Sequence, residues 1–177
     1  MNIGIFGSSQ PTNQEIKIKA EEVGKIIASK GYTVITGGVP GYPHIVAMSA
    51  MSVGGKAVVY AAGLTSDDHN KFYNLDLSQY TKTIFQDKYH DDKFSSIDLY
   101  ERSLKMVSQV DKAIIIGGRV GTMYEVTILS GLGKDMFVLE NSGGITKNTM
   151  ANFINEGHKE KSEIVYFNSP EELINLI

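Results

Sequence analysis

A carboxylate and a guanidinium flank one glycine-rich stretch of this chain. Glu125 closes the segment Gly117–Glu125, and Arg102 lies on the helical pattern that precedes it. A guanidinium binds phosphate well, and a carboxylate in the same site can bind sugar hydroxyls or orient a water molecule. The pattern alone leaves a second interpretation open for each residue. Glu125 also suits the first turn of a helix, and Arg102 also suits a solvated helix face.

Three turns of small residues could present backbone amides to the same ligand. Each turn follows an apolar strand pattern and precedes a helical one; together they contain Gly7, Ser8, Ser9, Gly37, Gly38, Gly41, Gly117, Gly118, Arg119, Gly121 and Thr122. Glycine lets the backbone approach a ligand closely, and the N-terminus of a helix attracts anions. Glycines also form ordinary tight turns, but three such turns together favour a phosphate or nucleotide site, in which Arg119 adds a cation.

Strand and helix patterns alternate along the whole chain. We expect strands at 3–6, 32–36, 56–60, 83–85, 112–116, 136–139 and 164–167, with helices at 13–30, 43–51, 97–109, 120–132 and 148–155 and a closing helix after Ser169. This alternation predicts an α/β fold: a single doubly wound, Rossmann-like domain spanning residues 1–177. Its sheet should be mostly parallel, with about six to seven strands and a ligand crevice at their carboxyl ends.

The polar segment 64–94 is the least regular part of the pattern. Long connections at the carboxyl edge of a parallel sheet often cover a ligand, so part of this segment could form a lid or specificity loop. A solvated excursion that contacts no ligand fits the same composition equally well.

Several nucleotide chemistries lack their sequence signals. No Gly-Lys-Ser or Gly-Lys-Thr follows either glycine loop, no Gly-x-Gly-x-x-Gly fingerprint is present, and no acidic residue ends the second strand. These features argue against ATP hydrolysis of the P-loop type and against ordinary NAD chemistry. We expect no cofactor and no metal. The histidines, His44, His69, His90 and His158, lack the spacing of metal ligands and favour surface or packing roles.

Composition favours a small-molecule partner. The net charge is −3 and the basic residues are spread along the chain, so we expect neither nucleic acid nor a membrane as a partner. The chain has no cysteine, which agrees with a reducing compartment. It shows no signal-peptide pattern and no apolar run of spanning length, so we expect a cytoplasmic protein.

The segment Gly117–Glu125 resembles the Pro-Gly-Gly-x-Gly-Thr-x-x-Glu motif of the LOG (lonely guy) family. These proteins are cytokinin riboside 5′-monophosphate phosphoribohydrolases, often labelled lysine decarboxylase-like. Arg102 matches the arginine of that family's Arg-Lys helix, and the first two glycine turns resemble its other loops. The chain departs from the family at Gly117 (proline there), Arg119 (glycine) and Ser103 (lysine).

The resemblance implies that Arg102 and Glu125 are catalytic, that the glycine loops bind the nucleotide, and that the protein forms a homodimer or a higher homo-oligomer. Two functions follow. The first is hydrolysis of the N-glycosidic bond of a nucleoside 5′-monophosphate to base and ribose 5-phosphate, and the second is a nucleotide-binding or sensing module without catalysis. A lysine decarboxylase is a third, weaker option, because no lysine stands in a context suited to a pyridoxal phosphate Schiff base.

Overall fold

A computed structural model describes residues 1–157 and 162–177, so His158 lies outside the described residues. Its strands form one sheet in the order β4-β3-β2-β1-β5-β6-β7, and every neighbouring pair is parallel. They are β1 (Asn2–Gly7), β2 (Thr33–Thr36), β3 (Lys56–Tyr60), β4 (Lys82–Ile84), β5 (Lys112–Ile116), β6 (Asp135–Leu139) and β7 (Ile164–Phe167). The chain order reverses at β1, which pairs with β2 on one side and with β5 on the other. In open α/β sheets, ligands bind beyond the carboxyl ends of the strands at such a point.

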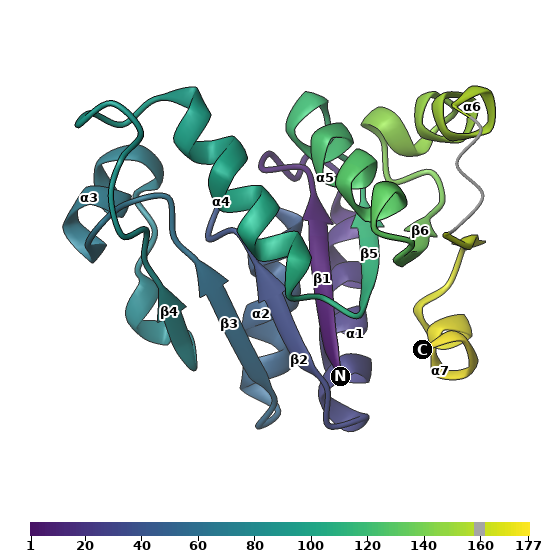
Figure 1. Ribbon diagram of the computed structural model, residues 1–177. Coiled ribbons are helices and arrows are strands. Elements are labelled where there is room, and N and C mark those ends of the chain that lie inside the picture. The colour runs from purple at the N-terminus through teal and green to yellow at the C-terminus, as the bar shows by residue number, and fades with distance from the viewer. Residues whose placement is uncertain (158–161) are drawn as a thin grey trace.

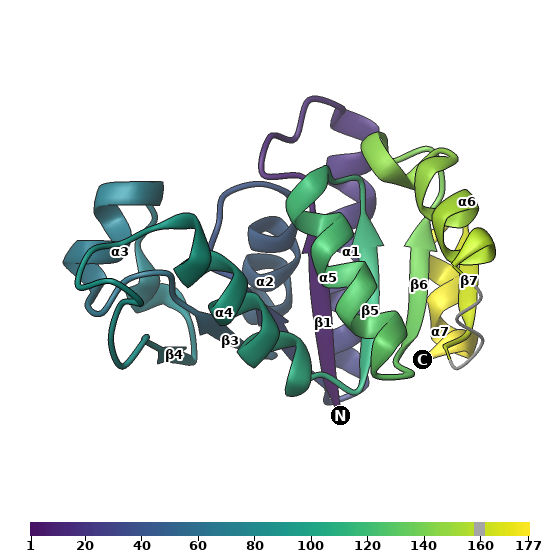
Figure 2. The same cartoon turned by 45° about the horizontal axis from the view of Figure 1, so that its top comes forward.

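Helices cover both faces of the sheet (Figure 1). The face that carries α1 (Gln14–Ser29) and α2 (Tyr42–Ser52) also carries α7 (Leu173–Leu176). The opposite face carries α4 (Ser96–Ser108), α5 (Val120–Gly131) and α6 (Thr149–Glu156). Figure 2 shows α4 and α5 side by side. Because α5 follows β5 directly, its N-terminus lies at the carboxyl edge of the sheet.

The strand β5, which lies between β1 and β6, is buried on both faces. Ile114 and Ile116 pack in the apolar cluster under α1 and α2, and Ile115 packs in the cluster under α4 and α5. A strand covered on both sides needs apolar residues at every position, which explains its unbroken run of isoleucines.

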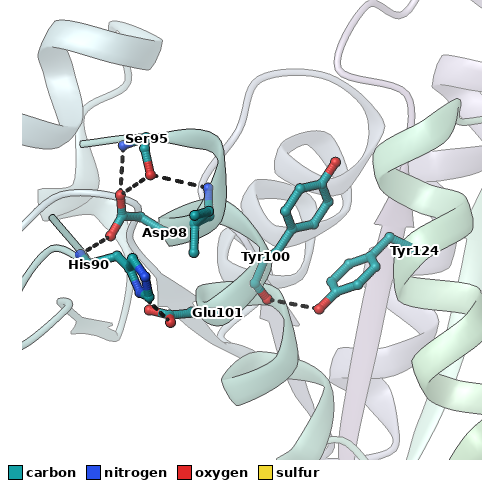
Figure 3. A network of polar contacts seen from close by, with 7 residues as sticks. His90, Ser95, Asp98, Tyr100, Glu101 and Tyr124 are labelled. Carbon is teal, nitrogen blue, oxygen red and sulfur yellow. Dashed lines mark hydrogen bonds and ion pairs between the residues drawn. The ribbon is translucent and has the colours of Figure 1, made fainter. Parts of the chain in front are cut away.

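The segment before α4 is fastened to that helix by a buried carboxylate (Figure 3). Asp98 accepts hydrogen bonds from the backbone N–H of His90 (2.7 Å) and from the backbone N–H (2.6 Å) and Oγ (2.9 Å) of Ser95. Ser95 is the N-cap of α4 and forms a capping box with Asp98. This arrangement fixes the entry of the chain into α4.

The predicted fold class is confirmed, and the described sheet is parallel throughout. The main difference lies in the polar segment 64–94, which contains the helix α3 (Ser66–Tyr73) and the short 3₁₀ helix η1 (Leu77–Gln79) before β4. Two further 3₁₀ helices are η2 (Gly144–Thr146) and η3 (Pro170–Glu172), and η3 forms the start of the predicted closing helix. Within residues 1–157 and 162–177, no helix combines the length and the apolar character needed to cross a membrane.

Candidate functional site

A pocket of about 320 Å³ opens at the carboxyl ends of β1, β2 and β5, where the strand order reverses. Its wall contains the turn after β1, the start of α5 and one side of α4. Among the candidate residues, those that line the pocket are Gly7, Ser8, Ser9, Arg102, Arg119, Gly121, Thr122 and Glu125. The remaining candidates, Gly37, Gly38, Gly41, Gly117 and Gly118, are buried and do not line it.

The turns after β1 and β2 are in direct contact. The backbone N–H of Tyr42 donates to the carbonyl of Ser8 at 3.0 Å. Gly41 has a φ of +107°, and a side chain there would overlap the backbone of Ser8 and Ser9. A side chain at Gly7 would likewise overlap the carbonyl of Ile116, at the end of β5. These close approaches bring all three predicted turns to one place.

The turn after β5 is supported from outside the pocket by the turn after β6. Gly117 donates its backbone N–H to Ser142 Oγ at 2.7 Å, and Gly118 accepts from the backbone N–H of Ile145 at 3.0 Å. Ser142 Oγ in turn donates to the carbonyl of Leu139 at 2.6 Å. The amide of Gly117 is therefore engaged within the protein, and Ser142 positions the loop. The glycine pair that follows Ser142 in the sequence was the signal that could have drawn attention to this turn.

The N-terminus of α5 faces the pocket without a capping side chain. Arg119 occupies the N-cap position, and the first turn of the helix contains no acidic residue. The first-turn amides, which include those of Gly121 and Thr122, have no intrahelical acceptor, as at any helix start. Thr122 Oγ1 donates to the carbonyl of Gly7 at 3.3 Å, which ties the helix to β1. Free amides, the helix dipole and the Arg119 side chain all favour an anion here.

Arg102 is buried beside the same pocket, with 7% of its surface exposed. Its Nη1 donates to the carbonyl of Gly37 at 2.8 Å and more weakly to that of Tyr60 at 3.5 Å. Its Nε is buried and has no hydrogen-bond partner among the described residues. A side chain at position 37 would overlap the guanidinium, so Gly37 acts by accommodating Arg102. A buried N–H group without a partner is costly.

Glu125 lies one turn inside α5 and lines the pocket. Burial raises the pKa of its carboxyl group to about 7, although the Arg102 charge and a hydrogen bond from Ser103 both lower it. Ser103 Oγ donates to Glu125 Oε1 at 3.3 Å. In the part of the chain that the structure describes, Glu125 and Arg102 form no ion pair within 4.0 Å. The two groups are therefore close enough to influence each other and remain free to contact a ligand.

Aromatic and apolar side chains that sequence reasoning missed line another part of the pocket. Tyr73, Leu99, Tyr100 and Tyr124 are among them. The rings of Tyr100 and Tyr124 meet edge to face with centroids 4.7 Å apart, and Tyr124 Oη donates to the Tyr100 carbonyl at 3.4 Å (Figure 3). Such a wall suits the flat face of an aromatic ring.

His69 has the packing role expected from the sequence, with a specific function in the loop after β2. It is fully buried on α3, and its Nδ1 accepts the backbone N–H of Ala62 at 3.1 Å. Its Nε2 must then carry the proton and donate to the carbonyl of Gly38 at 2.7 Å. Burial lowers the pKa of His69, which favours this neutral form. His69 and Arg102 thus hold the adjacent carbonyls of the glycine pair.

Residues 1–174 match the model of the SLOG cluster4 family. The chain belongs to the SLOG cluster4 family. A relative in Archaeoglobus fulgidus, an uncharacterized protein, is 31% identical over 134 residues, which is 76% of each chain. The resemblance to LOG proteins is thereby confirmed at the level of the wider SLOG, Rossmann-like group, and not for the LOG hydrolases in particular.

Solved structures share the fold of this SLOG chain. The structural-genomics target TM1055 superposes with a TM-score of 0.79 at 22% identity, covering 99% of this chain and 96% of the other. The molybdenum cofactor binding protein of Rippkaea orientalis gives 0.75 at 19% identity, with 99% and 93% covered. At such identities the likeness concerns the fold alone.

The exclusion of nucleic acid as a partner is wrong. DNA processing protein A of Helicobacter pylori, described by its single-stranded DNA binding mode, has a TM-score of 0.70 to this chain. The two share 16% identity over 99% of this chain and 79% of the other. Net charge averages over the whole surface, while a fold can carry sites for quite different ligands. The net charge of −3 therefore does not remove DNA from the ligands that this fold can serve.

Proposed function

We propose that the pocket binds a nucleoside 5′-monophosphate and hydrolyses its N-glycosidic bond, releasing the base and ribose 5-phosphate. One observation carries the proposal. Glu125 and the buried Arg102 face the same pocket as the uncapped N-terminus of α5, and they do so without pairing with each other. A ligand that carries a phosphate at one end and a polar sugar beside it matches this arrangement.

The phosphate is assigned to the N-terminus of α5. The amides of Gly121 and Thr122 offer hydrogen bonds there, the helix dipole attracts negative charge, and Arg119 adds an exposed cation. Glu125 follows Gly121 by one helical turn, which corresponds to a rise of about 6 Å at about 1.5 Å per residue. That distance is comparable to the separation of a 5′-phosphate from the ribose ring, so the sugar falls beside the carboxyl group.

Hydrolysis needs negative charge next to the sugar. As the bond from C1′ to the base nitrogen breaks, its electron pair leaves with the base and the ribose acquires positive charge, which a carboxylate stabilises. Water then adds to C1′, and Glu125 can accept the proton that it gives up. The base leaves with one proton, so that over the whole step the water molecule supplies a hydroxyl group to C1′ and a proton to the base. A carboxyl pKa of about 7 lets Glu125 both accept and release a proton near neutral pH.

Arg102 is assigned to the ligand's polar groups. Its guanidinium lines the pocket, so its positive charge acts on phosphate or sugar oxygens of a ligand there. By resemblance to the LOG family, this arginine assists phosphate binding or the departure of the base. Its hydrogen bond to Gly37 holds the guanidinium in place in either role.

A second candidate function is binding without chemistry. Arg119 lies in the turn between β5 and α5, at a position where LOG proteins have glycine, and it lines the pocket. It could obstruct the pose that hydrolysis requires while still binding an anion. A structural neighbour described as a molybdenum cofactor binding protein provides an example of this fold used for binding.

Product analysis separates the two functions. The protein is incubated with adenosine, guanosine, cytidine and uridine 5′-monophosphates, and the released base and ribose 5-phosphate are quantified by chromatography. We expect release from at least one nucleotide and a loss of about 100-fold or more in Glu125→Gln, since a positioned acid–base group contributes at least that much. Glu101→Gln is the matched control, because Glu101 is exposed on α4 and does not line the pocket.

Binding without release, with equal affinity in Glu125→Gln, would refute hydrolysis and leave the binding module. Failure of every nucleotide to bind would refute both functions.

A further inference from the structure

The helix α3 brings a side chain from the polar segment 64–94 into the pocket. Figure 1 shows α3 beyond the carboxyl ends of β3 and β4. Thr65 caps its N-terminus, and Asn74, in a left-handed conformation, ends it. Tyr73 is therefore the last residue of the helix, and it lines the pocket together with Arg102 and Glu125.

The position of Tyr73 follows from that of His69. The two residues are four apart on one helix, so they share a face. His69 is fixed on two sides by its hydrogen bonds to Ala62 and Gly38, and its ring lies 5.2 Å from that of Tyr73, centroid to centroid. A side chain on Gly63 would overlap the backbone of His69, so α3 packs closely against the strand end. Tyr73 thus rests on a rigid support anchored to the glycine loop.

Among the described residues, only burial and neighbouring charges act on the hydroxyl of Tyr73, and no hydrogen bond engages it. Burial raises its pKa, the charge of Arg102 lowers it, and the charge of Glu125 raises it further. The phenol is therefore protonated at neutral pH and able to donate, and it lies within electrostatic reach of both charged groups. A ligand that occupies the space beside Arg102 and Glu125 also meets this hydroxyl.

We propose that Tyr73 Oη binds a ribose hydroxyl of the nucleotide, so that the pocket prefers ribonucleotides to their deoxy counterparts. This inference rests on the proposed function, which places the sugar beside Glu125. It gives segment 64–94 a definite role, in which α3 supplies one specificity-determining side chain.

The test removes the proposed hydrogen bond in two ways, by changing Tyr73 in the protein and by removing a ribose hydroxyl from the ligand. Affinities of the wild-type protein and of Tyr73→Phe are measured by calorimetry for adenosine 5′-monophosphate, its 2′-deoxy and 3′-deoxy analogues, and inorganic phosphate. We expect the wild type to bind one deoxy analogue about 5-fold more weakly than the parent nucleotide, as for one hydrogen bond between uncharged groups. Tyr73→Phe should lose this preference and keep its affinity for phosphate. Tyr166→Phe, on β7 and outside the pocket, is the matched control.

The outcomes are distinct for the two proposals. If the wild type binds the nucleotide and Tyr73→Phe keeps the wild-type affinity for every ligand, including the wild-type preference for the parent nucleotide, the role of Tyr73 is refuted and the proposed function stands. If the wild type does not bind the nucleotide, the proposed function is refuted and the role of Tyr73 with it. Thermal unfolding of Tyr73→Phe should match the wild type, since the ring that packs on His69 is retained.

Discussion

Arg119 stands at a helix position where its charge is unfavourable in the ligand-free protein. It is the N-cap residue of α5, its side chain makes no capping hydrogen bond, and no acidic residue in the first turn compensates its charge. A serine at an N-cap stabilises a helix by about 1 kcal/mol relative to a residue that cannot cap. Removing a cation from the positive end of the helix dipole adds about 0.3–1 kcal/mol at low ionic strength.

The substitution Arg119→Ser should therefore stabilise the ligand-free protein by roughly 1–2 kcal/mol. For a chain of this size, each kcal/mol raises Tm by about 2–4 °C, so an increase of roughly 2–8 °C is expected in thermal unfolding at low salt. Arg119→Ala separates the two contributions, because it removes the cation without adding a cap. It should fall between the wild type and Arg119→Ser.

The same substitution should weaken anion binding. Loss of an exposed charged contact is expected to lower the affinity for inorganic phosphate or a nucleoside monophosphate about 5-fold, measured by calorimetry at the same ionic strength. Stability and binding should thus change in opposite directions. Two results would refute the assignment of an anion site to this helix end. One is an Arg119→Ser protein that is less stable than the wild type without ligand, and the other is an Arg119→Ser protein that binds phosphate as tightly as the wild type.

Three further predictions concern stability. The pKa of Glu125 rises from 4.5 to about 7 on folding, so the folded state binds the extra proton and the stability of the wild type falls as the pH rises through this interval. In thermal unfolding, Glu125→Gln should therefore be more stable than the wild type at pH 8, and the difference should shrink towards pH 4. Burial lowers the pKa of His69 from 6.5, so the wild type loses stability as the pH falls below about 6.5, because the unfolded state takes up a proton more readily than the folded state. His69→Gln should lessen this loss of stability. A side chain at Gly24 of α1 would overlap the Val46 carbonyl of α2, so Gly24→Ala should lower the free energy of unfolding in denaturant by about 1–3 kcal/mol. Gly131→Ala is the control: it has open space at the end of α5 and should raise the free energy of unfolding by up to about 1 kcal/mol. Three results would contradict these arguments: a Glu125→Gln protein no more stable than the wild type at pH 8, a His69→Gln protein with the wild-type dependence on pH below about 6.5, and a Gly24→Ala protein as stable as the wild type.

Much of the fold was predictable because its signals are local. The isoleucine run of β5 is typical of a strand covered on both faces. Asn13, at the start of α1, is a strong cap whose side chain accepts from the first-turn amides of Glu15 and Ile16. The meeting of the three glycine turns also followed from the sequence, because the carboxyl ends of parallel strands lie on one edge of the sheet. For Glu125 and Arg102 the pattern left a second interpretation open, and the resemblance to the LOG family favoured the site; both line the pocket.

Other parts of the site depend on contacts between residues distant in sequence. The glycine pair after Ser142 marks a turn, but no local signal shows that the Ser142 hydroxyl accepts the amide of Gly117, 25 residues away. The sequence of α3 is mostly polar, so it did not indicate that His69 is buried or that Tyr73 lies in the pocket. The glycine pair after β2 looked like a ligand-binding turn, yet Gly37 and Gly38 accept hydrogen bonds from Arg102 and His69 and so support the pocket from behind.

Amide NMR spectroscopy tests the central claim most directly, because it reports on the backbone groups assigned to the phosphate. Adenosine 5′-monophosphate is titrated into the isotope-labelled protein while the amide resonances of Gly121 and Thr122 are followed. A nucleotide phosphate at the N-terminus of α5 predicts that both amides shift in a saturable manner, with the same dissociation constant as in calorimetry. Saturable binding that leaves these two amides unshifted and perturbs residues elsewhere would contradict the account.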